Sequence, residues 1–172
     1  MDLIHNIPGI IQFEPEHKTK KHQLQGAWKK TAMVMFEGDI AEYYAWFLNR
    51  RYNLILNKPL RGGHISFIND SLGSMKNGIG TLEEKEALWQ SVKLKYDRSG
   101  INITLSLDPR TDSNHWWLNI PNEYRTELHE IRSDLGLGRP FWGLHMSIGY
   151  ANERNIHHSK YIHSLLTNGF IQ

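Results

Sequence analysis

The sequence predicts an α+β fold in which one structural unit occurs twice. Short apolar segments typical of strands alternate with amphipathic segments typical of helices. The pattern His-x-Ser followed by an apolar residue also occurs twice, at His64–Ser66 and His145–Ser147, each time after a strand and a helix. A recurring order of elements indicates a duplicated unit. We predict a single domain over residues 1–172, with repeat halves at about 27–75 and 101–167.

The N-terminal residues show no regular period. Residues 1–26 contain Pro8, Gly9 and Pro15, and we expect an arm or loop there. The basic run His17–His22 is typical of a solvated surface. Alternatively, its lysines form a rim that attracts phosphate to a nearby groove.

The first half then follows the order strand, helix, strand. Thr31–Phe36 is short and apolar, which predicts a buried strand. Asp39 is an expected N-cap for a helix from Ile40 to Leu48, whose apolar residues recur on one face. A loop rich in Gly and Pro leads from there into the strand of the first His-x-Ser motif.

The middle of the chain predicts a helix and a hairpin. Thr81–Glu84 is a capping-box pattern, which starts a short helix ending near Gln90. Lys93–Tyr96 and Ile101–Leu107 alternate with period two around the turn at Asp97–Gly100, which predicts a β-hairpin.

The second half repeats the order of the first. His115–Ile120 predicts a strand, which Pro121 ends. The next helix has apolar positions spaced four, three and four apart and stops at Gly136: Tyr124, Leu128, Ile131 and Leu135. Arg139–Gly143 leads into the second His-x-Ser strand, and residues 155–167 predict a closing helix.

Composition limits the classes of function. Twenty Lys and Arg against 18 Asp and Glu are too balanced for a broad nucleic-acid footprint, although a small anionic ligand is compatible. The absence of Cys excludes a disulfide framework and a cysteine nucleophile. The start of the chain lacks a signal peptide, and no apolar run approaches the roughly 20 residues that span a bilayer. We therefore expect a cytoplasmic protein with no membrane association and no protein partner.

The two motifs carry the strongest chemical signal. Side chains two apart on a strand share a face, so His64 lies beside Ser66 and His145 beside Ser147. The residues between and after them face inward: Ile65, Phe67, Met146 and Ile148. A lone strand histidine is more often an ordinary surface or core residue. Two histidines in matching contexts favour catalysis instead.

These motifs resemble those of the two-histidine (2H) phosphoesterase superfamily, and the resemblance covers most of residues 31–167. It implies a bilobal fold with two small antiparallel sheets flanking a central groove and helices on the outside. It also implies cleavage of nucleotide phosphodiester bonds without a metal or other cofactor. Gly63 stands where that family usually has an apolar residue, so the strand is expected to begin at His64 or to carry a bulge.

Within the superfamily, the chain looks like the phage enzymes that destroy cyclic-oligonucleotide immune signals (anti-CBASS enzymes). That resemblance implies a cyclic oligonucleotide substrate and, for a phage-encoded protein, the host cytoplasm. Two alternatives stay open. One is an enzyme that acts on RNA ends, as a 2′,3′-cyclic phosphodiesterase or a 2′-5′ RNA ligase-like enzyme. The other is a non-catalytic nucleotide- or RNA-binding module.

The predicted site combines catalysis with substrate binding. The two histidines would serve as general acid and general base, in an order that the sequence leaves open, and the two serines would donate to phosphate oxygens. The expected substrate-binding residues are Arg139, Trp142, Tyr150 and Trp28. Core packing is the alternative for the aromatic residues.

No metal site is expected. His157, His158 and His163 lie on the closing helix, but none is three or four residues from another, which the usual paired ligands of a helix require. His115 and His129 have no partner that the sequence identifies.

Overall fold

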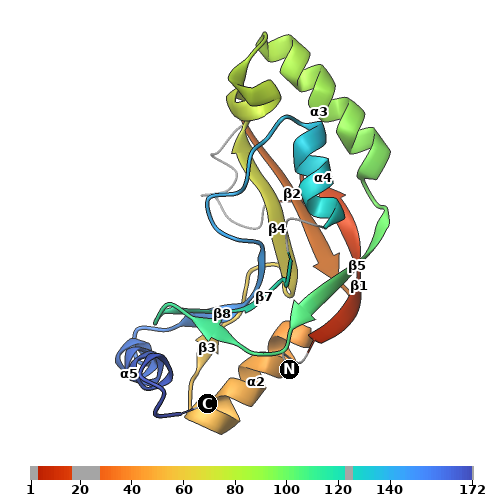
Figure 1. Cartoon of the computed structure of the whole chain (residues 1–172). Helices are drawn as coiled ribbons and strands as arrows, with labels where there is room; N and C mark the ends of the chain where they lie inside the picture. The colour runs from red at the N-terminus through yellow and green to blue at the C-terminus, as the bar shows by residue number, and fades with distance from the viewer. Residues whose placement is uncertain (1–3, 17–27, 123–125, 172) are drawn as a thin grey trace.

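The computed structural model describes residues 4–16, 28–122 and 126–171. These residues form an α+β fold with two four-stranded antiparallel sheets, each in its own lobe of a crescent-shaped molecule (Figure 1). The expected fold class is confirmed.

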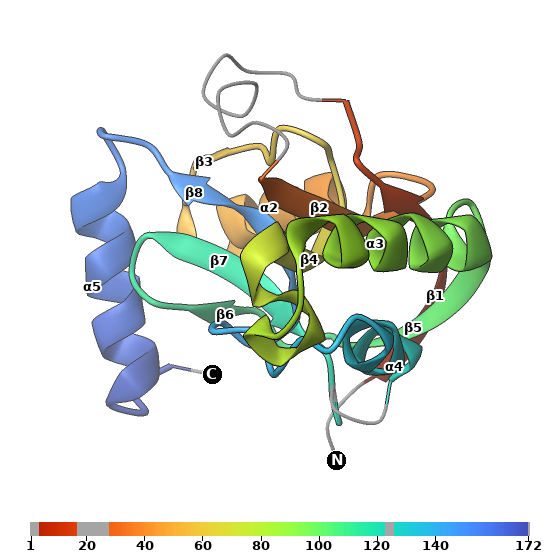
Figure 2. The ribbon, with the colours of Figure 1, turned by 90° about the horizontal axis from the view of Figure 1, so that it is seen from above.

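The first sheet has the strand order β4-β2-β1-β5. Its strands are β1 (Ile4–Phe13), β2 (Lys29–Phe36), β4 (His64–Ser71) and β5 (Gly100–Ser106). The elements that pack with it are the 3₁₀ segment η1 (Leu72–Gly78) and the helices α3 (Leu82–Tyr96) and α4 (Glu127–Asp134), as Figure 2 shows from above. The buried ring of Trp89 on α3 lies 4.9 Å from the ring of Phe13 on β1.

The second sheet has the strand order β3-β8-β7-β6. Its strands are β3 (Leu56–Asn57), β6 (Arg110–Thr111), β7 (His115–Asn119) and β8 (His145–Ala151). The helices that belong to this lobe are α2 (Ile40–Tyr52) and α5 (Ile156–Thr167). Buried Trp116 on β7 donates through Nε1 to Ser159 on α5 at 2.9 Å, which ties that helix to the sheet.

The prediction of a loop over residues 1–26 is wrong for the part that the structure describes, because β1 is an inner strand of the first sheet. Pro8 is tolerated because it pairs with β5 alone, as the pairing of β1 with β2 begins at Gly9. Gly9 permits the close approach of β2, since a Cβ there would lie 2.4 Å from Val34. The basic run His17–His22 falls outside the described residues.

The predicted hairpin is also wrong. Lys93–Tyr96 forms the last turn of α3, and β5 pairs with β1 instead. Trp89, Val92 and Tyr96 recur with helical spacing on the packed side of α3, and this burial outweighs the short alternation of Lys93–Tyr96. The capping box at Thr81 and Glu84 is confirmed.

The other predicted strands and helices are present and differ mainly at their ends, whereas the short strands β3 and β6 and the 3₁₀ segment η1 were not predicted. α4 begins at Glu127, and Gly136, with a φ of 64°, follows its C-terminus as expected. Tyr124, an expected apolar position of this helix, lies outside the described residues. Asp39 occupies the N-cap position of α2 without a side-chain capping bond.

The two halves share a structural irregularity. β2 and β4 are joined through α2, and β7 and β8 are joined through α4. Both pairs carry a bulge at the third residue after the motif histidine, where Phe67 or Ile148 has no partner in the register. The helices are exchanged between the halves, because α2 packs against β8 and α4 against β4. β4 and β8 are also in contact, so the two motif strands lie together between the lobes.

Candidate active site

The two motif histidines are held in the same way. His64 bonds through Nδ1 to the carbonyl oxygen of Gly62 at 2.9 Å, and His145 bonds through Nδ1 to that of Gly143 at 2.7 Å. A carbonyl can only accept, so Nδ1 carries the proton in both rings. Nε2 is then a lone-pair acceptor in the neutral ring and a donor in the charged ring. Each histidine is thus prepared to take or give a proton at Nε2.

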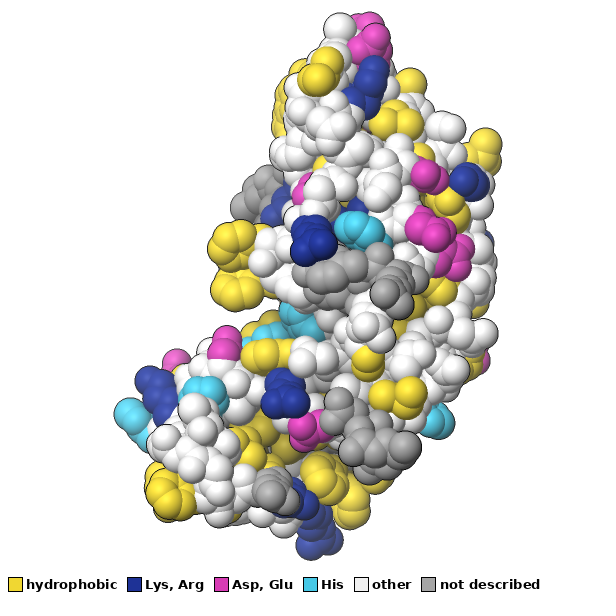
Figure 3. Space-filling model, viewed as in Figure 1, with side chains coloured by type: hydrophobic (Ala, Val, Ile, Leu, Met, Phe, Trp, Pro, Cys, Tyr) yellow, Lys and Arg dark blue, Asp and Glu magenta, His cyan; other side chains and the backbone are white. Residues whose placement is uncertain are grey.

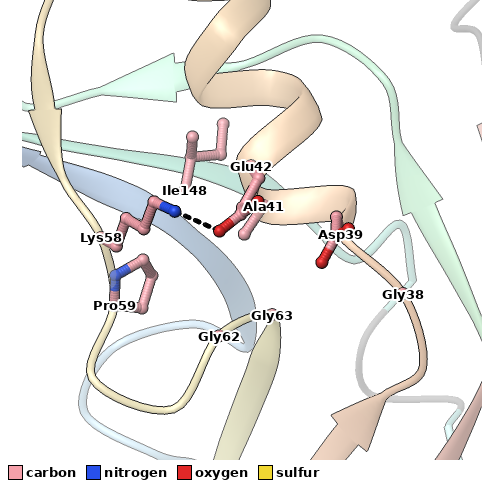
Figure 4. A pocket seen from close by; sticks show the side chains of 9 residues that line it. All are labelled: Gly38, Asp39, Ala41, Glu42, Lys58, Pro59, Gly62, Gly63 and Ile148. Atoms are coloured by element: carbon pink, nitrogen blue, oxygen red, sulfur yellow. Dashed lines mark hydrogen bonds and ion pairs between the residues drawn. The ribbon is translucent and has the colours of Figure 1, made fainter.

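The backbone before His64 is shaped by α2. Gly63 is buried, and a Cβ on it would lie 3.1 Å from Ile40 and 3.6 Å from Met146. Figure 4 shows Gly62 and Gly63 at the edge of a pocket of about 180 Å³, opposite the ion pair of Lys58 and Glu42. A glycine at position 63 therefore suits the close packing on α2. β4 begins at His64, and its bulge lies further on, at Phe67.

The surroundings of His64 favour its neutral form. Burial lowers the pKa of His64, and the charges of Arg61 and His145 lower it further, while the bond to the Gly62 carbonyl opposes the shift. Arg61 precedes His64 by three residues, and it donates to the carbonyl of Glu16 at 3.0 Å. Arg61 was not among the predicted site residues, although its place in the loop just before the motif was a usable signal.

The two motif serines differ in their contacts. Ser147 lies 2.8 Å from Nε2 of His115, measured from its Oγ. Ser66 is exposed, and no hydrogen bond joins its side chain to another of the described residues. His115, for which the sequence identified no partner, is therefore a third histidine of the site. It begins β7, whose partner strand β8 carries Ser147.

A pocket of about 400 Å³ opens beside His145. Its walls come from β7, β8, the turn before β7 and the loop before β8. Its lining residues are Asp112, His115, Trp117, Asn119, Trp142, Gly143, His145 and Tyr150. Figure 3 shows the hollow between the lobes, with histidine side chains on its wall. Aromatic rings beside a proton-transfer group suit a ligand that has both a flat ring and a reactive ester.

Tyr150 reaches this pocket because of the bulge in β8. Five residues separate it from His145, so an unbroken strand would point the two side chains to opposite faces. The extra residue Ile148 restores the shared face, and the ring of Tyr150 stacks on His115 with centroids 4.5 Å apart. Trp142, 74% exposed, lines the same pocket.

The structure does not bring the other two expected binding residues into this pocket. Arg139 is exposed on the loop before Trp142 and is not among the lining residues. Trp28 precedes β2 at the end where Lys29 pairs with Ser71, seven residues along β4 from His64. At about 3.3 Å per residue this is roughly 23 Å from the histidine. Trp28, 63% exposed, therefore lies far from the motif residues.

A buried arginine fixes the loop that carries Trp142. Arg132 on α4 donates through Nε and Nη2 to the carbonyl of Gly138, at 2.9 and 2.7 Å. Its Nη1 donates to the carbonyl of the bulge residue Phe67 and to Asp70, both at 2.8 Å. One side chain therefore joins α4, the first motif strand and the loop that leads to the second motif.

The ring of His115 makes a testable contribution to stability. Its pKa is lowered to about 4, chiefly by burial and also by the charge of His145, whereas Asp112 opposes the shift. The unfolded state, with a pKa of about 6.5, binds a proton first as pH falls. Stability from this group is therefore present above pH 6.5 and lost as pH falls toward 4.

We expect His115→Gln to weaken this acid sensitivity. Urea unfolding at several pH values between 4 and 7 should give a free energy of unfolding that falls less steeply in the variant than in the wild type. His157→Gln, on the exposed side of α5, is the control and should keep the wild-type slope. Equal slopes for His115→Gln and the wild type would contradict the assigned shift.

None of the helices in residues 4–16, 28–122 and 126–171 is long and apolar enough to cross a membrane. Within the same ranges, no three His, Asp or Glu side chains gather in a group that could hold a metal ion.

Comparison with protein-family models, curated proteins and solved structures finds no match to this chain.

Proposed function

We propose that this protein is a phosphodiesterase that cleaves nucleotide phosphodiester bonds by two-histidine general acid/base catalysis without a metal. One observation carries the proposal: His64 and His145 lie on two strands in contact, and each is held by a hydrogen bond from Nδ1 to a backbone carbonyl. Such cleavage needs a base for the attacking hydroxyl and an acid for the leaving oxygen, and two Nε2 atoms supply both. Arg61, near His64, supplies a cation for the phosphate.

His64 acts as the base in this proposal. Its lowered pKa keeps the ring neutral at pH 7, so Nε2 has a lone pair for the attacking hydroxyl. His145 then protonates the leaving oxygen. Ser147 and Ser66 lie on the same faces as these rings and donate to the non-bridging oxygens, where charge accumulates.

The aromatic pocket favours a nucleotide over a simple phosphodiester. Trp117, Trp142 and Tyr150 lie beside His145, and aromatic faces stack with nucleobases at about 1–3 kcal/mol per base. Cyclic oligonucleotides are the substrates we propose, as in the phage counter-defence enzymes that the sequence resembles.

A substrate panel in the presence of EDTA tests the proposal. Cyclic dinucleotides, cyclic trinucleotides, RNA ending in a 2′,3′-cyclic phosphate and a 2′-5′-linked dinucleotide are incubated with the protein, and products are separated by liquid chromatography. Linear products from the cyclic oligonucleotides support the proposed substrate. Cleavage of the RNA end alone assigns the enzyme to RNA processing, and binding without cleavage of any substrate identifies a binding module.

The pH dependence of cleavage tests the role of His64. Because protonation of the base stops the reaction, kcat/KM should fall on the acidic side with a midpoint below 6.5, the ordinary value for histidine. The measurement is initial rate at low substrate between pH 4.5 and 8. A midpoint at or above 6.5 would remove His64 from the role of base.

A further inference from the structure

Aromatic rings hold His115 in one orientation. Its ring stacks on Tyr150 at 4.5 Å and 11°, and the ring of Trp117 lies 5.1 Å away. The ring of His145 approaches edge-on at 5.3 Å. Tyr150 is also the register partner of His115 across the two strands, so backbone and ring contacts agree. A ring packed in this way points Nε2 at a fixed place, which is the hydroxyl of Ser147.

The first motif lacks this arrangement. Tyr150 follows its motif histidine by five residues, and the matching position after His64 is Asn69. Asn69 pairs with Thr31, which therefore takes the place that His115 has in the second half. Thr31 has no imidazole to offer. The duplicated unit thus gives the two motif serines different support.

His115 could act on Ser147 in two ways. It could accept the serine proton and make Ser147 a nucleophile, or it could donate Nε2–H and leave the serine proton free to turn. The first role requires a base whose pKa lies near the working pH. The pKa of His115, lowered to about 4, makes it a poor base at pH 7. A neutral ring can still hold the serine through the 2.8 Å contact between Nε2 and Oγ, and donation of Nε2–H would leave the serine proton available to the phosphate.

We infer that His115 is a positioning residue, which donates Nε2–H to Oγ of Ser147 and so turns the serine proton toward the scissile phosphate. This inference rests on the proposed function and extends it, because it makes the two motif serines unequal. Ser147 is the oriented donor to the phosphate, whereas Ser66 has no such bond to another of the described residues. The loss of Ser147 should therefore cost more activity than the loss of Ser66.

Nitrogen NMR of the imidazoles tests the hydrogen bond without any substrate. At pH 7 the wild-type spectrum should show His115 as the neutral tautomer protonated at Nε2. In Ser147→Ala, its nitrogen shifts should move, whereas Ser66→Ala should leave them in place. The Nδ1–H tautomer, or shifts that ignore Ser147→Ala, would overturn the inference.

Double-mutant kinetics test the consequence. Ser147→Ala should lower kcat by about 10²-fold, the usual cost of one such donor, with little change in KM. His115→Ala should lower kcat less, His115→Gln should recover part of the loss, and the His115→Ala/Ser147→Ala double variant should match Ser147→Ala alone.

A matched control uses another histidine bonded through Nε2. His158 on α5 donates to the carbonyl of Tyr52 at 2.5 Å, so any effect of His158→Ala should multiply with that of Ser147→Ala. The contrary result is a protein that cleaves nucleotides while the kcat losses of His115→Ala and Ser147→Ala multiply in the double variant. That result would overturn the inference and leave the proposed function intact. If none of the nucleotides is cleaved, the proposed function fails and the positioning role fails with it.

Discussion

His64→Ala and His145→Ala should each lower turnover of the preferred nucleotide by about 10²–10⁴-fold, the usual contribution of one proton transfer. The reason is that each ring offers Nε2 from a position fixed by a backbone carbonyl. Among the described residues, the nearby His115 does not replace a missing ring, because it is already bonded to Ser147. Steady-state kinetics at saturating substrate is the measurement.

Both variants should remain folded. The two rings are only partly buried and bond to turns at the start of their strands, so their removal leaves the core packing in place. Circular dichroism and urea unfolding check this, and His157→Ala on the exposed side of α5 is the control for the loss of an imidazole. A folded His64→Ala or His145→Ala protein with a near-normal rate would refute two-histidine catalysis.

Arg132→Ala should lower the free energy of unfolding by about 3–5 kcal/mol, the usual cost of leaving a buried ionic partner alone. The side chain is 2% exposed and pairs with Asp70, whose side chain is 25% exposed. The variant would also leave the carbonyls of Phe67 and Gly138 without their donor. Urea unfolding followed by fluorescence measures the loss.

Two further variants separate burial from charge. Arg132→Lys keeps the charge but cannot reach all of these acceptors with one ammonium group, so its stability should fall between wild type and alanine. Arg110→Ala breaks an exposed pair with Asp108, whose side chains are 58% and 65% exposed, and should cost at most about 1 kcal/mol. Equal losses for Arg132→Ala and Arg110→Ala would show that the buried network does not stabilise the fold.

The fold class could be predicted because local sequence carries its signals. The apolar run of β2, the periodic face of α2 and the capping box of α3 are each complete within a few residues. β1 could not be predicted, because Pro8 and Gly9 are ordinary turn residues. Pro8 fits a strand here because it pairs with β5 alone, and Gly9 fits because β2 approaches it closely. The last turn of α3 was misassigned for the same reason, since burial against the sheet decided its conformation.

The candidate site, like the fold, could be predicted only in part. The repeated His-x-Ser pattern identified the two histidines and placed each serine on the same face as its histidine, because alternation along a strand is a local property. The bond between His115 and Ser147 depends on which strands meet. Trp28 appeared suitable as an aromatic residue near the first strand, but the register places it at the opposite end from His64.

The sequence by itself determined the duplicated order of strand, helix and motif strand, because hydrophobic period and residue spacing are local properties of the chain. Only the tertiary structure decided how the two copies differ. Both bulges fall at the same place after the histidine, yet they bring Tyr150 beside His115 in one copy and Asn69 beside Thr31 in the other. The pairing and register of the strands decide which side chains are adjacent across a sheet. A local sequence pattern does not contain this information.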